Sequence, residues 1–283
     1  MTKLMHRRSG TVTASIVALL AAMTPTMGHG AASERAAEGK TYDLWIRNGT
    51  IIDGTGRDRF AADILVSGDT IALIGATEAG KVKARRTIDA SGKIVTPGYI
   101  DLHSHGDPLN ESFLNFLAQG ITTVVLGQDG GTASFEASAE PSLAEWRAAL
   151  AAPPADAKTA VTLPQWMQRV DAHGSEVNIA ALAGHGSLRG IAGVGEAPQP
   201  TPAQLNAMKE VLQADLAAGA FGMSFGLEYA PGRYSKVDEQ KALGDLVGKH
   251  GGVVMSHMRS EDFDKIGTDR KSTRLNSSHP YRS

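Results

Sequence analysis

After Pro97 the sequence alternates between short apolar stretches and longer amphipathic ones, and this alternation constrains the fold more than any other feature. It predicts repeated strand–helix units. Such units place their strands parallel in one sheet, so the fold class is α/β, either a doubly wound sheet or a (β/α)8 barrel. We expect strands at about 99–105, 121–126, 177–183, 220–225 and 252–257, and helices at 111–118, 142–151, 164–173, 202–218 and 237–249.

The first of these strands ends in two histidines, His103 and His105. Residues i and i+2 of a strand point to the same face, so we expect Asp101, His103 and His105 on one side. Neutral imidazole is a favoured ligand for zinc and similar ions, and barrel enzymes build their active sites at the carboxyl ends of the strands. We therefore predict half of a metal site here, with two structural core histidines as the alternative.

The other strands also end in polar clusters, which favours the barrel over the doubly wound sheet. Asp129 lies in a glycine-rich loop after the second strand, His185 follows the third, Tyr229 follows the fourth, and His257 and Arg259 end the fifth. A carboxylate in a glycine loop is also typical of an Asx turn, so Asp129 has two interpretations. Five strands are expected where a barrel needs eight.

Between Tyr42 and Val95 the pattern is one of short strands broken by Gly, Asn and Asp. This predicts a small β-sandwich segment, which we assign to residues 34–96. Expected strands are 44–47, 50–52, 63–66, 70–74 and 86–88, with turns at 47–49, 53–54, 67–69 and 91–92.

Residues 1–33 have the pattern of a signal peptide: basic residues, an apolar run from Val12 to Met23, then small residues. The run is too short to span a membrane comfortably, so we expect export, to the periplasm or outside the cell, and no membrane association after cleavage. The chain has no cysteine, which suits an oxidising compartment. Its net charge of -2 gives no electrostatic footprint for nucleic acid.

The C-terminal residues, 269–283, lack any apolar periodicity. Residues 269–279 are similar to one frame of a common sequencing-adapter oligonucleotide, so we expect a non-native tail here. On this interpretation the barrel segment is 97–268, the first five β/α units of the barrel, and the natural sequence continues beyond Thr268.

The segment from Pro97 to His105 resembles the amidohydrolase superfamily of metal-dependent hydrolases. Three further segments, 184–189, 226–232 and 256–261, are similar to its N-acyl-D-amino-acid deacylase (D-aminoacylase) branch. The resemblance covers about residues 42–268. It implies the N-terminal part of a metal-dependent (β/α)8 (TIM) barrel, preceded by half of a small β-sandwich domain and incomplete in this chain.

The resemblance also implies a set of metal ligands. His103 and His105 would hold one metal ion, and His257 would be a ligand of a second, tighter site. In this branch a cysteine after the second strand ligates the metal, and Asp129 occupies its position here. A carboxylate is a competent but harder ligand, so Zn²⁺ is the first expectation for the divalent metal, while Mn²⁺ and Co²⁺ become less disfavoured.

Other site residues have two interpretations each. His185 is expected to orient a ligand or polarise the substrate, or else to make a structural hydrogen bond. Tyr229 and Arg259 are expected to bind the substrate side chain and carboxylate, with an ion pair from Arg259 to Glu261 as the alternative. The resemblance places the general-base aspartate beyond Thr268, so we expect the chain as written to be inactive.

The function implied is metal-dependent hydrolysis of a non-peptide C–N (amide) bond, namely deacylation of small-molecule N-acyl-D-amino acids. One alternative is cyclic amide opening by a dihydroorotase-like or hydantoinase-like enzyme. Another is a fragment without catalytic activity.

Overall fold

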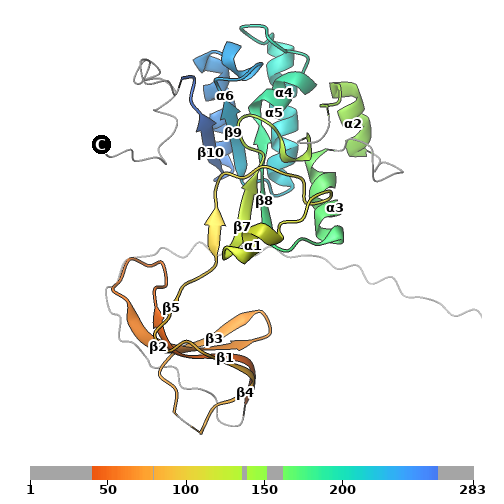
Figure 1. Cartoon of the computed structure of the whole chain (residues 1–283). Helices are drawn as coiled ribbons and strands as arrows, with labels where there is room; N and C mark the ends of the chain where they lie inside the picture. The colour runs from red at the N-terminus through yellow and green to blue at the C-terminus, as the bar shows by residue number, and fades with distance from the viewer. Residues whose placement is uncertain (1–39, 79, 136–138, 152–161, 261–283) are drawn as a thin grey trace, which may run out of the picture. The chain divides into compact units, whose positions relative to one another are not determined.

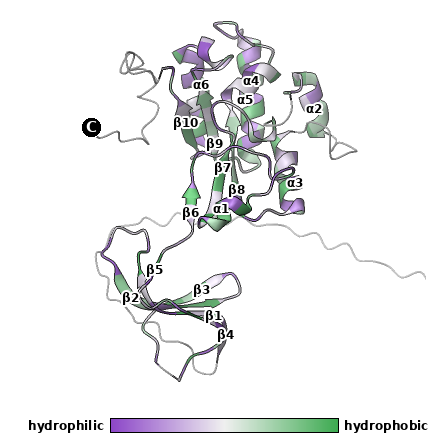
Figure 2. Ribbon diagram, viewed as in Figure 1, coloured by the Kyte–Doolittle hydropathy of each residue, from purple (hydrophilic) through white to green (hydrophobic). Residues whose placement is uncertain are grey.

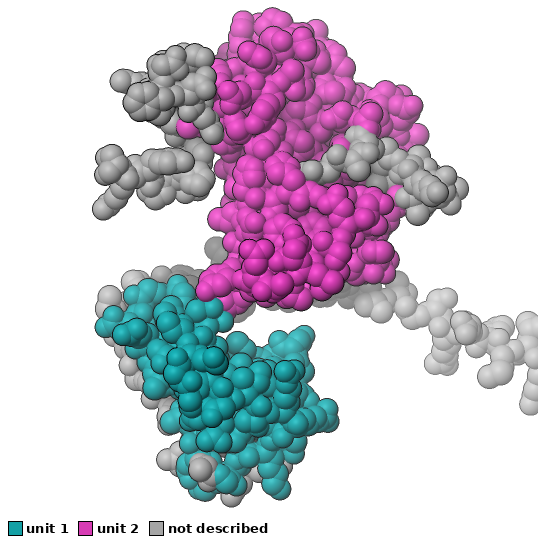
Figure 3. Space-filling view, in the orientation of Figure 1, with its two compact units in different colours: residues 1–96 teal, residues 97–283 magenta. Residues whose placement is uncertain are grey.

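The computed structural model describes residues 40–78, 80–135, 139–151 and 162–260. The chain divides into two compact units, with the division between Thr96 and Pro97 (Figure 3). The predicted signal peptide and C-terminal tail lie outside the described residues. None of the described helices combines the length and the apolar character that crossing a membrane requires.

The first unit contains one mixed sheet, in the order β3-β2-β1-β4, with β5 also paired to β1. Strands β1, β2 and β3 pair antiparallel, whereas β4 and β5 pair parallel to β1. Ile64 and Leu65 are consecutive in β2 and belong to different apolar clusters, so each face of the sheet buries its own cluster. The strands are β1 (Thr41–Ile51), β2 (Phe60–Ser67), β3 (Thr70–Gly75), β4 (Lys83–Asp89) and β5 (Ile94–Val95).

The structure corrects the sequence prediction within β1. The two expected strands are one continuous strand, and the expected turn at residues 47–49 is an irregularity inside it. The register with β2 shifts between Ile46 and Gly49, and Asn48 has φ of 61°. Asn tolerates this left-handed conformation, so a bulge absorbs the residues that predicted a turn.

The second unit contains a five-stranded sheet in the order β10-β9-β8-β7-β6, and every pair is parallel (Figure 1). The strands follow one another in chain order without the reversal that marks a doubly wound sheet. This is the order of a (β/α)8 barrel, and five consecutive strands form an incomplete one. The strands are β6 (Tyr99–Asp101), β7 (Ile121–Leu126), β8 (Asn178–Gly184), β9 (Gly222–Gly226) and β10 (Val253–His257).

Helices flank this sheet, and the core lies between the two layers. Figure 2 shows the central strands as largely apolar and the helices as a mixture of apolar and polar residues. Met208, Leu212 and Leu243 on helices pack with Met223 and Phe225 of β9. The helices are α1 (Leu114–Ala118), α2 (Leu143–Ala151), α3 (Leu163–His173), α4 (His185–Ile191), α5 (Pro202–Ala217) and α6 (Val237–Lys249), with short 3-10 turns η1 (Ala133–Phe135) and η2 (Gly232–Tyr234).

Four of the five expected barrel strands are confirmed to within two residues at each end. Helix α5, which corresponds to the predicted helix at 202–218, begins with a capping box in which Thr201 pairs with Gln204 ahead of Pro202. The first strand was predicted wrongly, because it ends at Asp101 rather than at residue 105. A short helix that was not predicted, α4, begins at His185.

Candidate metal centre

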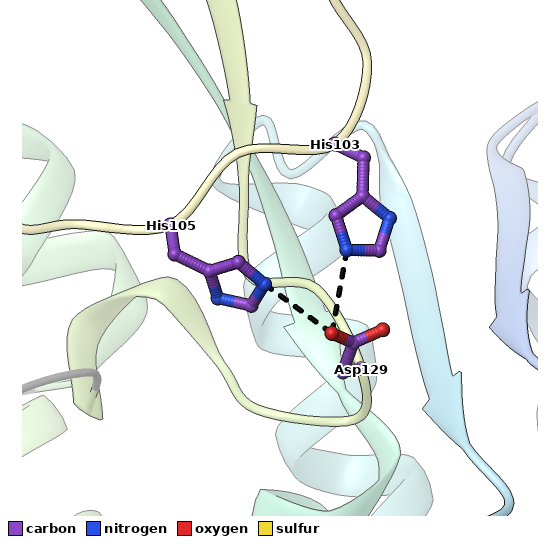
Figure 4. Close-up of side chains that lie close together, drawn as sticks. All are labelled: His103, His105 and Asp129. Atoms are coloured by element: carbon purple, nitrogen blue, oxygen red, sulfur yellow. Dashed lines mark hydrogen bonds and ion pairs between the residues drawn. The ribbon is translucent and has the colours of Figure 1, made fainter.

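The two histidines lie in an irregular segment just after β6, so strand alternation does not orient them. Hydrogen bonds donated by main-chain amides hold this segment instead. The amide of His103 donates to Asp101 Oδ1 at 3.1 Å, and the amide of Ser104 donates to the carbonyl oxygen of Val125, in β7, at 3.1 Å. The imidazoles nevertheless converge, as Figure 4 shows, because both point toward Asp129.

The loop after β7 carries Asp129 to the carboxyl end of the sheet. Asp129 has φ of 55°, a left-handed conformation that few non-glycine residues adopt. Gly130 follows with φ of 84°, and its amide donates to Ser224 Oγ in β9 at 3.0 Å. A Cβ atom at Gly226 would lie 1.8 Å from the carbonyl oxygen of Asp129, so only glycine permits this close approach.

The carboxylate of Asp129 is the centre of the cluster. Its Oδ2 lies 3.3 Å from His103 Nε2 and 3.2 Å from His105 Nε2, and its Oδ1 lies 3.4 Å from His257 Nδ1. Oδ1 is buried and forms no hydrogen bond, because its contact with His257 has the distance of an ion pair without hydrogen-bond geometry. One oxygen therefore faces the histidine pair and the other faces the histidine at the end of β10.

The structure also bears on the Asx-turn interpretation of Asp129. In an Asx turn the side chain accepts a hydrogen bond from the amide two residues later. Here the amide of Gly131 donates to the carbonyl oxygen of Gln128 at 2.9 Å. The carboxylate of Asp129 points to the imidazoles instead, so its position is explained by the cluster and not by the turn.

These residues fit a divalent cation. Single ligand atoms of His103, His105 and Asp129 all lie within 4.8 Å of one another. His257 stands outside this group of three and reaches the cluster through Asp129 Oδ1. Imidazole nitrogens and carboxylate oxygens are the donor set of zinc sites without thiolates, and the buried Oδ1 without a hydrogen bond is an atom that a cation would satisfy.

His257 has a second partner that the sequence analysis did not single out. Its Nε2 lies 2.8 Å from Glu228 Oε2, and its Nδ1 lies 3.4 Å from the hydroxyl of Tyr229. The rings of Tyr229 and His257 are 4.6 Å apart between centroids. Tyr229 thus lies beside the cluster with 46% of its surface exposed, where a substrate has access to it.

His185 lies apart from these ligands, in a buried ionic cluster. Its Nε2 is 2.8 Å from Glu239 Oε1, and Arg189 Nη1 donates to both oxygens of that carboxylate at 2.8 and 2.7 Å. Burial lowers the pKa of His185 from its ordinary value of 6.5, although the carboxylate opposes the shift. With no surface exposed, His185 takes the structural alternative, bonded to Glu239.

Arg259 is tied to main-chain carbonyls. Its Nη1 donates to the carbonyl oxygen of Arg233, and its Nη2 donates to that of Ser235 at 3.1 Å. The guanidinium therefore braces the residues around η2, near the strand ends. Glu261, its expected partner, lies outside the described residues, so substrate binding by Arg259 stays a prediction.

Two carboxylates that contact these histidines, Glu228 and Glu239, were not predicted from the sequence. Glu228 lies within the flagged segment 226–232, and its place immediately before Tyr229 at the end of a strand was the available signal. Glu239 lies in the first turn of α6, where acidic residues are expected for the helix dipole alone. Only the tertiary structure reveals its buried partners.

Comparison with known proteins gives several close relatives, although no family model matches the chain. N-acyl-D-glutamate deacylase of Alcaligenes xylosoxydans is 36% identical over 222 residues, 77% of this chain and 44% of the relative. D-aminoacylase of the same organism is 30% identical over 234 residues, 80% of this chain and 46% of the relative. The chain thus spans about half the length of the curated relatives it matches. A dihydroorotase of Streptococcus pyogenes matches over 29% of this chain.

Comparison with solved structures identifies the same kind of protein. The crystal structure of N-acyl-D-glutamate deacylase from Bordetella bronchiseptica, complexed with zinc and a phosphonate mimic of the tetrahedral intermediate, is 36% identical to this chain. The alignment covers 84% of this chain and 49% of that protein, with a TM-score of 0.69. The incomplete barrel deduced from strand order therefore has the fold of a metal-dependent hydrolase.

Proposed function

This chain is a homologue of the N-acyl-D-amino-acid deacylases of the amidohydrolase superfamily, and from that premise we propose that the protein hydrolyses the amide bond of N-acyl-D-amino acids. The observation that carries the proposal is Asp129, whose carboxylate is surrounded by His103, His105 and His257 at 3.2 to 3.4 Å. A carboxylate so placed at the carboxyl ends of barrel strands supports a site for a divalent cation.

His103, His105, Asp129 and His257 would hold the metal, with Zn²⁺ as the first candidate. A zinc ion supplies Lewis acidity, which polarises an amide carbonyl and lowers the pKa of a water molecule to about 7. Asp129 faces the histidine pair through Oδ2 and His257 through Oδ1, so its two oxygens are suited to two adjacent cation positions. Tyr229 and Arg259 would contact the acyl-amino-acid substrate.

We also propose that the protein is exported, on the pattern of residues 1–33. Export would explain why Asp129 occupies the position at which the resemblance implies a cysteine. A thiolate in an oxidising compartment is converted to sulfenic acid or a disulfide, whereas a carboxylate is not. Asp129 keeps a negative ligand and avoids that reaction.

An enantiomer-resolved assay tests the proposed activity. The protein encoded by the genomic reading frame, whether that frame ends at Ser283 or continues, is loaded with Zn²⁺ and offered N-acetyl-D-glutamate, N-acetyl-D-aspartate and N-acetyl-D-methionine, with the L-enantiomers as controls. We expect acetate release from at least one D-substrate. Ring opening of dihydroorotate or a hydantoin without any deacylation would show that the alternative is right.

Substitution of the two histidines tests their proposed role as ligands. Replacing His103 or His105 by Ala should abolish turnover of the D-substrate and lower the amount of bound Zn²⁺, because each substitution removes one metal ligand. Metal content and turnover equal to those of the wild type in both variants would exclude the pair as ligands.

A further inference from the structure

Glu228 is a carboxylate bonded to a proposed metal ligand. Its Oε2 lies 2.8 Å from His257 Nε2, and 38% of its side chain is exposed. We propose that Glu228 is a positioning residue for His257, which holds the proton on Nε2 and turns the lone pair of Nδ1 toward Asp129. The proposal deepens the proposed function, on which it rests.

The first step of the argument concerns the proton. An ionised carboxylate only accepts hydrogen bonds, so His257 Nε2 must be the donor in its contact with Glu228. A neutral imidazole carries one proton, and Nδ1 is then left with a lone pair. That lone pair faces Asp129 Oδ1 at 3.4 Å, while Tyr229 offers its hydroxyl to the same nitrogen at 3.4 Å.

The second step concerns the difference between the histidines. His103 and His105 face Asp129 through Nε2, whereas His257 faces it through Nδ1. Free histidine does not enforce either tautomer, so a histidine that must present Nδ1 gains from a partner that fixes the proton on Nε2.

The third step concerns the rigidity of this arrangement. The amide of Leu227 donates to the carbonyl oxygen of His257 at 3.0 Å, so the ends of β9 and β10 are joined beside the contact. The amide of Tyr229 donates to the carbonyl oxygen of Gly226 at 3.3 Å, which closes a turn around Glu228. The backbone thus places Glu228 against the imidazole.

The tautomer of His257 tests the proposal without any substitution. Long-range ¹H–¹⁵N correlation spectra of the metal-free wild-type chain at pH 8, with His257 assigned through His257→Gln, distinguish the protonated ring nitrogen from the unprotonated one. We expect the proton on Nε2, and in Glu228→Ala a shift toward a mixture of tautomers. A proton on Nδ1 in the wild type would overturn the proposal, whether or not metal binds.

Zn²⁺ affinity, measured by competition with a chromophoric chelator, provides the second readout. We expect Glu228→Ala to bind Zn²⁺ about 10–100-fold more weakly than the wild type, the loss typical of removing a carboxylate behind a ligating histidine. Glu228→Gln should recover most of the affinity, because the amide oxygen still accepts the Nε2 proton. Equal losses in the two variants would identify Glu228 as a charged ligand, and no loss in either would show that it is dispensable; both outcomes contradict the proposal.

Glu210→Gln is the matched control. Glu210 has a similarly exposed side chain, at 44%, and is paired with Arg147, so its replacement should leave Zn²⁺ affinity unchanged. Near-ultraviolet circular dichroism checks that each variant is folded. If Glu228→Ala does not fold, Glu228→Gln and the wild-type tautomer still decide. A wild-type chain that binds no Zn²⁺ would contradict the proposed function. The tautomer of His257 tests only the proposed role of Glu228.

Discussion

Two clusters in the barrel unit pair histidine with carboxylate, and they differ in solvent access and in charge balance. In the candidate metal centre, His103 and His105 lie beside Asp129, and the side chain of each is 51% exposed. In the cluster of His185 and Glu239, no more than 2% of either side chain is exposed. The same residue types therefore occur in an accessible site and in a sealed one.

Their charge balance explains what each can do. The sealed cluster contains a guanidinium, because Arg189 bonds both oxygens of Glu239 and also donates to the carbonyl oxygens of Gly195 and Ala197. Its carboxylate already has a cation. The metal cluster consists of imidazoles and the carboxylates of Asp129 and Glu228, a set that a divalent cation completes. Among the described residues, the contacts given above for the two clusters thus differ in that only the carboxylate of Glu239 is paired with a guanidinium.

The substitution with the largest expected effect on the free energy of unfolding tests the difference in burial between the two clusters. Glu239→Ala leaves Arg189 buried without its carboxylate, so we expect the free energy of unfolding to fall by about 3–5 kcal/mol. Chemical denaturation of the metal-free chain measures it. The exposed pair of Arg147 and Glu210 is the control, since Glu210→Ala should cost less than about 1 kcal/mol. Similar costs for both substitutions would mean that the sealed cluster is solvated.

Asp215 of α5 sharpens the comparison, because it is a buried carboxylate without a cation. Burial raises its pKa well above the ordinary value of 3.8, and its Oδ1 has no hydrogen bond. A raised pKa means that stability is lost as the pH rises above the unfolded value toward the folded one. Asp215→Asn should therefore raise the free energy of unfolding at pH 8, because the amide has no charge to bury. A destabilised Asp215→Asn at pH 8 would contradict this account of its burial.

The smallest effect concerns the pH dependence that His185 contributes. Because burial lowers its pKa, the unfolded chain takes up a proton below pH 6.5 that the folded chain does not. The free energy of unfolding should fall with pH below about 6.5, by at most ~1.4 kcal/mol per pH unit from this group. In His185→Gln the slope between pH 7.5 and 5.5 should be shallower than in the wild type. Equal slopes would show that folding does not lower the pKa of His185.

The sequence predicted four of the five barrel strands to within two residues at each end, because each is an apolar run bounded by glycine or a polar cluster. It predicted β1 less well, because Asn48 and Gly49 are turn residues that here form a bulge inside a strand. Helix α4 was missed, because its seven residues begin with the polar run His185 to Ser187 and carry little amphipathic pattern.

The candidate site was likewise predicted from the sequence only in part. His103 and His105 were predicted as metal ligands from their place after the first barrel strand, whereas the roles of Asp129 and His257 were implied by the family resemblance. Parallel strands bring all four positions to one edge of the sheet. Glu228 and Glu239 were missed, because their partners come from other elements and only tertiary packing brings them together. The local sequence pattern also could not distinguish His185, which is buried, from His257, which lies beside Asp129.

Zn²⁺ binding by Asp129 variants tests the central claim most directly. The wild-type chain should bind Zn²⁺ tightly, Asp129→Ala should bind it at least ~100-fold more weakly because a ligand is lost, and Asp129→Cys should retain binding under reducing conditions because thiolate is a competent zinc ligand. Equilibrium competition and elemental analysis measure affinity and stoichiometry. Undiminished affinity and stoichiometry in a folded Asp129→Ala would contradict the account, because the carboxylate at the centre of the three imidazoles would then have no part in holding a metal.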